Sequence, residues 1–267
     1  DNLSRGGAPR NLEWLKKEFG ENSFNLIVGD IKDDKKITEA AKDADVIMHL
    51  AGQVAVTTSV INPRDDFESN ALGTFNVLEA ARASGRNPIF IYASTNKVYG
   101  GMEDVELYEE PTRWRYKDLV NGCPETQPLD FHSPYGVSKG AGDQYVRDYY
   151  RIYGLNTVVF RQSCIYGYRQ FGIEDQGWVA WFTIAAALNK EITIYGDGKQ
   201  VRDVLFIDDL LDAYEAAIKN IDRVKGQAFN IGGGPKNTLS LLELISFLEE
   251  FFNKKISLKF SNWRPGD

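Results

Sequence analysis

Short apolar runs alternate with longer amphipathic stretches along most of this chain. The apolar runs have the length of buried strands and cover residues 24–29, 44–50, 88–93, 157–160 and 228–231. Between them, apolar residues recur at helical spacing, and the longest such stretches cover residues 63–84, 134–153, 177–189 and 208–220. Alternation of this kind predicts an α/β fold in which helices cover both faces of a parallel sheet.

One predicted helix begins with a pattern suited to proton transfer. Ser133 is a favourable N-cap residue, and Pro134 fits the first helical turn, where no backbone N–H is needed. Tyr135 and Lys139 then project from the same face, one turn apart. A neighbouring ammonium favours the phenolate, whose unperturbed pKa is ~10, so the pair suits proton exchange with an alcohol. Taken alone, the pair is also compatible with an ordinary surface helix.

Hydroxyl residues follow the predicted strand at 88–93. Ligands gather at the carboxyl ends of parallel strands, where Ser94 and Thr95 stand. Their hydroxyls suit a hydrogen bond to the substrate oxygen that Tyr135 deprotonates, and the alternative is a Ser/Thr pair that only caps the strand. With Tyr135 and Lys139 downstream, we favour catalysis by Thr95, Tyr135 and Lys139.

Composition restricts the classes of function. The 267 residues are 43% hydrophobic, and no apolar run approaches the ~20 residues that span a bilayer. A net charge of −7 argues against a nucleic-acid partner. Two cysteines and two histidines lie without metal-ligand spacing, so we expect neither a bound metal nor a disulfide. We therefore expect a soluble cytoplasmic enzyme with no membrane partner, and a removed signal peptide stays open.

Landmark residues follow one another in an order that a known family shares. They are Gly29-Asp30-Ile31, His49-Leu50-Ala51-Gly52-Gln53, Asn70, Ser94-Thr95, Val98-Tyr99-Gly100, Tyr135, Lys139, Arg161, Tyr166-Gly167, Gly196-Asp197-Gly198, Arg202-Asp203-Val204 and Phe229-Asn230-Ile231-Gly232. On these residues the chain resembles, over nearly its whole length, the extended short-chain dehydrogenase/reductases that epimerise or dehydrate nucleotide-diphosphate sugars. The resemblance implies a Rossmann-like doubly wound parallel sheet, a smaller C-terminal α/β substrate lobe, NAD as cofactor and a nucleotide-diphosphate sugar as substrate.

The resemblance also divides the chain. Residues 1–162 correspond to the NAD-binding domain, to which residues 203–232 return, and residues 163–267 correspond to the nucleotide-sugar lobe. The strand, glycine-rich turn and helix that open such a domain have no counterpart before Asp1, and the family usually continues beyond Asp267. We therefore expect a fragment of a longer protein, and whether this chain alone binds NAD stays open.

Cofactor contacts are implied by the resemblance position by position. Asp1 matches the acid that binds the adenosine ribose and favours NAD over NADP, because a carboxylate repels the 2′-phosphate of NADP. Asn70 would hold its helix against the cofactor loop. The other residues implied to line the cofactor are Asn2, Ser4, Arg5, Asp30, Ile31, Leu50, Ala51, Gly52, Gln53, Tyr92, Ser94, Tyr135 and Lys139.

Substrate contacts are expected mainly among basic and aromatic residues after Cys164. A nucleotide diphosphate presents a planar base and at least two negative charges. Arg202 is the expected phosphate clamp, and Tyr195 is expected to stack on the base. The remaining residues implied to contact substrate are Thr95, Asn96, Ser163, Arg169, Gln170, Arg264 and Asp267. For each arginine taken singly, a surface ion pair is the alternative.

The residues after Thr95 bear on the reaction. Dehydratases of the family carry an Asp-Glu pair where this chain has Asn96-Lys97, and an amide cannot act as the acid in the loss of water. Several short segments are similar in sequence to those of the CDP-paratose 2-epimerases of lipopolysaccharide O-antigen biosynthesis. They are the segments around Gln53, Val98, Phe131 and Gly177, together with the long segment 101–132. The resemblance implies that Tyr135 removes the proton of the C2 hydroxyl.

Two alternative functions stay open, and a second copy of the chain is an expected partner. Another sugar-nucleotide enzyme, such as a UDP-glucose/galactose 4-epimerase, is the nearer alternative, and a non-catalytic NAD-binding protein is the more distant one. Relatives commonly pair through the Tyr/Lys helix and the long helix before it, so we expect a homo-oligomer. Tyr145, Tyr149 and Tyr153 form an apolar face that fits such an interface or packs inside the monomer.

Overall fold

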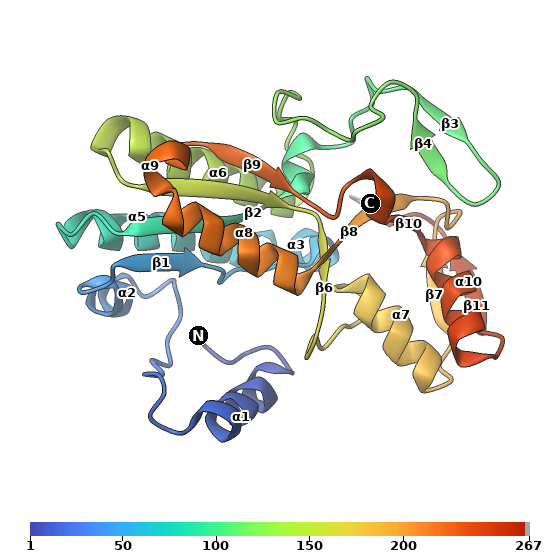
Figure 1. Ribbon diagram of the computed structural model, residues 1–267, viewed down its shortest axis with the longest axis horizontal. Helices are drawn as coiled ribbons and strands as arrows, with labels where there is room; N and C mark the ends of the chain where they lie inside the picture. The colour runs from blue at the N-terminus through green and yellow to red at the C-terminus, as the bar shows by residue number, and fades with distance from the viewer. Residues whose placement is uncertain (265–267) are drawn as a thin grey trace.

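The computed structural model describes residues 1–264 and contains a parallel sheet at its centre (Figure 1). The four strands lie in the order β1-β2-β5-β9 and are all parallel. Their bounds are Val46–His49 for β1, Ile89–Thr95 for β2, Thr157–Gln162 for β5 and Ala228–Ile231 for β9. Four of the five predicted strands are therefore confirmed, and so is the α/β class.

Helices cover both faces of this sheet, because successive strand residues point to opposite sides. Phe90, Tyr92 and Val159 pack in one core against α5 (Gly73–Ala83) and α6 (Ser133–Tyr153). Ile91 and Phe160 pack on the other face against α8 (Ile207–Lys219), followed by the short α9 (Ile221–Val224). Figure 1 shows α8 on one side of the sheet and α5 and α6 on the other. Burial on both faces explains why the strands are apolar throughout.

The predicted strand at 24–29 is wrong. This segment lies between α1 (Ala8–Phe19) and α2 (Asp34–Ala41) and is not assigned to any strand. Its backbone makes only two bonds to Asp1, one from Gly29 N–H and one to the Ile27 carbonyl. Leu26, Ile27 and Val28 are 40%, 50% and 53% exposed. An apolar run becomes a strand only when a ladder of neighbours pairs with it, and here that ladder does not form.

The predicted helix at 63–84 contains an irregular turn. It consists of α4 (Pro63–Phe67), a π-helical turn η1 (Glu68–Leu72) and α5, and it follows α3 (Val56–Ile61). π-turns insert one extra residue per turn and occur often at functional sites. Asn70 lies in this turn and is buried. The π-turn thus sets the direction of a side chain that the sequence assigned to the cofactor side.

A second lobe has its own sheets and its own core. One sheet contains β6 (Cys164–Tyr166), β8 (Val201–Phe206) and β10 (Thr238–Ser240), and the other pairs β7 (Ile192–Tyr195) with β11 (Leu258–Ser261). Helices α7 (Trp178–Ala187) and α10 (Leu241–Phe252) pack around Ile192 and Ile194. The separate core supports the two-lobe division, which we keep as a proposal, with β8 in the second lobe and the return to the first beginning at α8.

The segment 101–132 contains an antiparallel hairpin of β3 (Leu107–Glu109) and β4 (Trp114–Tyr116). Short 3₁₀ turns, η2 (Asn96–Tyr99) and η3 (Pro235–Asn237), complete the assigned elements. In Figure 1 the hairpin lies beyond the end of the main sheet, near β10 and α10. Among the helices of residues 1–264, none combines the length and hydrophobicity needed to cross a bilayer.

Candidate active site

The Tyr135 and Lys139 side chains lie in the first turns of α6. Ser133 has a left-handed φ of 65° and is the first residue of α6, whose N-cap position is His132; its Oγ accepts the backbone N–H of Gly136 at 3.2 Å, the bond expected of a capping side chain. Pro134 follows in the first turn. Tyr135 and Lys139 are 9% and 7% exposed. Together with Thr95, which is also buried, they form what we call the catalytic wall.

The Lys139 ammonium is buried, and within residues 1–264 it forms no ion pair with a carboxylate. Its Nζ donates to the carbonyl of Ala93 at 2.5 Å and lies 4.4 Å from the centre of the Tyr92 ring. Burial lowers the pKa of Lys139 to about 8, although Asp143 and Asp66 oppose this shift. A desolvated cation of this kind is suited to binding hydroxyl oxygens and to influencing a neighbouring phenol.

The Tyr135 phenol is protonated at neutral pH in the protein alone. Burial raises its pKa to about 12, and a hydrogen bond with Thr95 acts in the opposite direction. Lys139 therefore does not lower the pKa of Tyr135 as expected, because its ammonium is held by the Ala93 carbonyl. Activation of the phenol requires additional positive charge at the site.

The hydroxyls at the end of β2 have different partners. Thr95 Oγ1 accepts the N–H of Lys97 at 3.2 Å, which caps η2, while its side chain also bonds Tyr135. Thr95 thus caps a short helical turn and also contacts Tyr135, while its predicted hydrogen bond to the substrate oxygen stays a prediction. Ser94 Oγ instead donates to Asp143 Oδ2 at 2.8 Å. Tyr92 is fully buried, and its hydroxyl donates to the Lys139 carbonyl at 3.3 Å.

A buried polar cluster joins the π-turn to α6 and to the loop after β1. The Asn70 amide donates to the Gln53 carbonyl at 3.0 Å and to Asp66 Oδ1 at 3.1 Å. Asp66 Oδ2 accepts the hydroxyl of Ser138 at 2.5 Å. Burial raises the pKa of Asp66, and hydrogen bonds from Ser138 and Asn70 oppose the shift. Sequence reasoning missed Asp66, whose only signal was its position one turn before Asn70.

The same loop offers close access to its backbone. Asn70 Oδ1 is buried and has no hydrogen-bond partner among the described residues. It lies beside Gly52, where a Cβ would stand 2.6 Å from it, so only glycine fits. Leu50 and Ala51 are exposed at the same loop. A glycine cradle, an unpaired buried acceptor and the Lys139 ammonium fit a dinucleotide with hydroxyl donors and phosphates.

Residues near the chain start form a small hydrogen-bonded group. The Asn2 amide donates to Asp30 Oδ2 at 3.0 Å, and Asn2 Oδ1 accepts the N–H of Ser4. Asp1 Oδ1 accepts the N–H of Leu3. Two further residues of the predicted cofactor side are placed differently: Ile31 packs against the main core, and the Arg5 guanidinium donates to Gln176 Oε1 at 2.8 Å.

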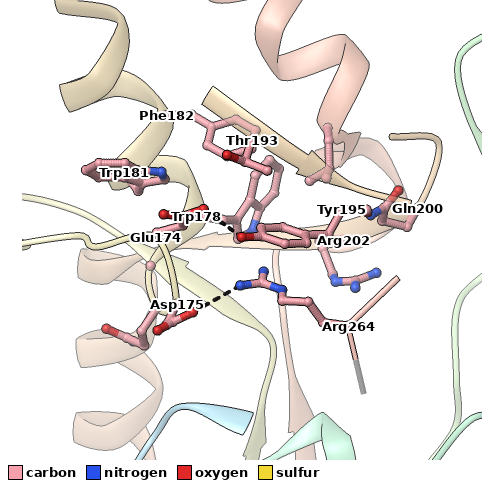
Figure 2. A pocket seen from close by; sticks show the side chains of 13 residues that line it. Glu174, Asp175, Trp178, Trp181, Phe182, Thr193, Tyr195, Gln200, Arg202 and Arg264 are labelled. Atoms are coloured by element: carbon pink, nitrogen blue, oxygen red, sulfur yellow. Dashed lines mark hydrogen bonds and ion pairs between the residues drawn. The ribbon is translucent and has the colours of Figure 1, made fainter. Parts of the chain in front are cut away.

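A pocket of about 150 Å³ lies in the second lobe and brings Tyr195, Arg202 and Arg264 together (Figure 2). The Arg264 guanidinium lies 4.1 Å from the centre of the Tyr195 ring. The Tyr195 hydroxyl donates to Glu174 at 2.8 Å, and Arg264 pairs with Asp175 at 3.1 Å. The other lining residues were not predicted from the sequence, although some of them belong to the segment around Gly177 that resembles the family. They are Glu174, Asp175, Gln176, Gly177, Trp178, Trp181, Phe182, Thr193, Gln200 and Leu241.

Other residues predicted to contact substrate lie outside this pocket. The Arg169 guanidinium is taken up by α1, where it donates to Asn11 and lies 4.5 Å from the Trp14 ring. Gln170 donates to the Ile165 carbonyl. Ser163 Oγ is buried without a partner among the described residues, Asn96 is exposed beside Thr95, and Asp267 lies outside the described residues.

Residues 1–232 match the family model described as the NAD dependent epimerase/dehydratase family. The chain belongs to this family. It is 51% identical to the CDP-paratose 2-epimerase of Salmonella typhi over 98% of this chain and 78% of that protein. The family assignment confirms the prediction of an NAD-dependent enzyme with a Rossmann-like fold.

Solved structures agree with the fold and the cofactor. The UDP-glucuronic acid 4-epimerase of Bacillus cereus, solved with UDP-glucuronic acid and NAD, superposes with a TM-score of 0.79 at 28% identity and covers 98% of this chain and 75% of its own. A dTDP-glucose 4,6-dehydratase from Streptomyces venezuelae, also solved with NAD, gives 0.80 at 25% identity, with 97% and 72% covered. NAD is therefore the cofactor, as predicted.

Proposed function

We propose that this protein epimerises a nucleotide-diphosphate sugar at C2, converting CDP-paratose to CDP-tyvelose. The observation that carries the proposal is the buried Thr95–Tyr135–Lys139 wall in a chain 51% identical to a CDP-paratose 2-epimerase. A C2 epimerisation by oxidation and re-reduction requires a proton acceptor at the C2 hydroxyl, removal of hydride from one face of C2, and return of hydride to the opposite face of the resulting ketone. NAD, when bound, supplies the hydride acceptor and the returning hydride.

Residues of this chain carry out the proton transfer and hold the cofactor and the sugar. Tyr135 takes the proton of the C2 hydroxyl as the sugar becomes a ketone and returns it as the opposite epimer forms. Thr95, bonded to Tyr135, orients the same oxygen, and Lys139 supplies positive charge that favours the phenolate. The Gly52 loop, Gln53, Asn70 and Lys139 hold the cofactor in this proposal. The wall excludes water, which protects the keto sugar between the two halves of the reaction.

Epimerisation fits better than dehydration at this site. Asn96 follows Thr95 and is exposed, and the N–H protons of its amide are too weakly acidic for it to act as the acid in the loss of water. The catalytic wall provides one proton-transfer group, Tyr135, which suffices for oxidation and re-reduction of one hydroxyl. The proposal therefore needs no second acid at the sugar.

The second-lobe pocket would receive the nucleotide diphosphate. Arg202 and Arg264 supply charge for the phosphates, and Tyr195 supplies an aromatic face for the base. A CDP sugar is favoured through the relative named above, and the cytoplasmic location remains part of the proposal. In the pocket, Glu174 and Asp175 already engage Tyr195 and Arg264, so binding requires exchange of these partners.

We also propose a homo-oligomer formed through α5 and α6. Phe75 and Tyr145 are 38% and 47% exposed on these helices, with their rings 5.8 Å apart, and Tyr153 is 53% exposed. Tyr149 does not belong to this face, because it is buried and its hydroxyl donates to Glu79. Exposed aromatic groups on two neighbouring helices support burial by a second copy.

A substrate panel tests the proposed reaction. Proton NMR of the intact protein with NAD is recorded on CDP-paratose and, separately, on UDP-galactose. Formation of the C2 epimer from the CDP sugar alone is the expected result. Conversion of UDP-galactose alone would contradict the proposal and favour a 4-epimerase.

A further inference from the structure

The segment 101–132, which we call the strap, is attached firmly to the second lobe. Arg113 Nε donates to Glu243 Oε1 at 2.7 Å, and its other nitrogens reach Glu243 Oε2 and both oxygens of Thr238. The two charged side chains are only 12% and 22% exposed. Burial opposes the charge on Glu243, yet hydrogen bonds from Arg113, Ser240 and Thr112 lower its pKa to about 2. This pair is therefore a strong anchor.

A second set of contacts joins the strap to the turn before Arg202. Trp114 Nε1 donates to Asp197 at 2.8 Å, and the Trp114 N–H donates to the Lys199 carbonyl at 3.0 Å. Lys199 Nζ in turn contacts Glu109 at 2.5 Å. The turn at 197–199 leads directly into β8, which carries Arg202 into the second-lobe pocket.

The other end of the strap reaches the main sheet at Asn230 of β9. The carbonyl of Cys123 accepts the Asn230 amide, and Glu125 accepts its backbone N–H, both at 2.8 Å. Asn230 Oδ1 accepts the hydroxyl of Tyr99 at 2.7 Å. Close to Tyr99, Gly100 has a φ of 68° and lies where a Cβ would stand 2.1 Å from the Asp130 carbonyl. The strap backbone thus packs directly against the end of η2.

From Tyr99 a chain of buried hydrogen bonds continues to the catalytic wall. Arg161 donates to the Tyr99 oxygen at 2.9 Å and pairs with both oxygens of Asp143 at 2.9 and 3.0 Å. Arg161 and Asp143 side chains are 2% and 0% exposed. Asp143 lies one turn after Lys139 on α6 and accepts the hydroxyl of Ser94, the neighbour of Thr95. Buried ion pairs hold only one good geometry, so they transmit position.

We propose that the strap couples the position of the second lobe to alignment of the catalytic wall, with Tyr99 as the positioning residue at the junction and Arg113 as the anchor on the second lobe. The inference rests on the proposed function for its kinetic consequence and on the contacts above for its structural one. Tyr99 does not touch the reacting atoms in this proposal; it acts through Arg161 and Asp143.

Hydrogen exchange of the intact protein tests the structural coupling without substrate. Arg113→Met removes the anchor, and Arg115→Met is the matched control, because Arg115 lies two residues further along the hairpin, in β4, and forms a more exposed pair with Glu110. With Arg113→Met, the rate of amide exchange in the strap is expected to rise about tenfold, because hydrogen bonds to a charged group are lost. The rate is also expected to rise at residues 138–144 of α6. A rise confined to the strap, or an equal effect of Arg115→Met, would overturn the coupling.

Kinetics test the positioning role. Tyr99→Phe is expected to lower kcat about tenfold through loss of a hydrogen bond to a charged group while KM stays nearly constant, whereas Arg113→Met raises KM. Tyr108→Phe, on the exposed face of the hairpin, is the control. In the double variant the losses in kcat/KM should fall short of their product by about threefold or more. Independent, multiplying effects contradict the inference.

The two proposals fail in different ways. If the wild-type protein converts no nucleotide sugar, the proposed function is wrong, and the exchange experiment still decides on the coupling. If the wild type is active and Arg113→Met leaves exchange at 138–144 unchanged, the coupling is wrong and the proposed function stands. Circular dichroism and thermal unfolding verify that each variant is folded.

Discussion

The catalytic wall is buried and hydrogen-bonded, whereas the second-lobe pocket is bordered by a partly exposed ion pair. Tyr135 and Lys139 are less than a tenth exposed. In the pocket, Asp175 is 47% exposed in its pair with Arg264. Proton transfer depends on groups that are already in place, because reorganisation at the moment of reaction costs rate. A pocket for an exchanging ligand must instead release its internal partners, which exposed pairs do at little cost.

The largest expected effect lies at the catalytic wall. Tyr135→Phe keeps the ring and removes the proton-transfer group, so kcat should fall by about 10²–10⁴-fold, the usual contribution of general acid–base catalysis. Steady-state assays with CDP-paratose measure it. Tyr145→Phe, exposed on the same helix, should leave kcat unchanged, and retention of full activity by Tyr135→Phe would remove Tyr135 from the mechanism.

The next effect separates the pocket from the wall. Arg202→Met should raise KM about 10- to 100-fold, since a hydrogen bond to a charged group contributes roughly 1.5–3 kcal/mol, and should change kcat little. Arg169→Met provides the comparison, because Arg169 is engaged by α1. Equal KM values for the two variants would show that Arg202 does not bind the phosphates and that the pocket is wrongly assigned.

Burial of Lys139 predicts a specific dependence of stability on pH. Its pKa falls from 10.5 in the unfolded chain to about 8 in the folded protein. Between these values the unfolded chain binds more protons, so stability rises with pH from about 8 to 10.5, by at most about 1.4 kcal/mol per pH unit. The burial penalty is present in full below pH 8. Urea unfolding at pH 7.5 and 9.5 should show wild type gaining stability relative to Lys139→Met, and equal gains in both proteins would contradict it.

The smallest effect tests release of a pocket partner. Asp175→Asn weakens the ion pair with Arg264, which at this exposure is worth about 0–1 kcal/mol. KM for the CDP sugar should therefore fall by up to about fivefold, measured in the same assay. An increase in KM would mean that Asp175 binds the ligand rather than competing with it. Glu215→Gln, in an exposed pair on α8, serves as the control.

Local sequence patterns predicted the residues of the catalytic wall better than they predicted the buried ion pair behind it. Ser133, Pro134, Tyr135 and Lys139 depend on one helical turn, and the structure reproduces the cap and the shared face. Asp143 on α6 and Arg161 on β5 are 18 residues apart and meet because α6 packs across the face of the sheet. Packing between separate elements leaves no short-range pattern, so their contact could not be predicted without the fold.

The wrong predictions about the fold have a similar physical origin. The run at 24–29 has the composition of a strand, but strand formation depends on neighbours that a single segment does not specify. The π-turn around Asn70 has no periodicity signal, because one extra residue shifts the pattern only slightly. In the second lobe, Trp178 and Trp181 were recognised as part of a helix, and their place in the pocket follows from how α7 packs against β7.

One labelling experiment tests the central claim, that the wall carries oxidation and re-reduction at C2. CDP-paratose carrying deuterium at C2 is incubated with the intact protein and NAD in ordinary water. We expect CDP-tyvelose that retains deuterium at C2, and no product from Tyr135→Phe. Loss of the label to water, or inversion at another carbon, would contradict it.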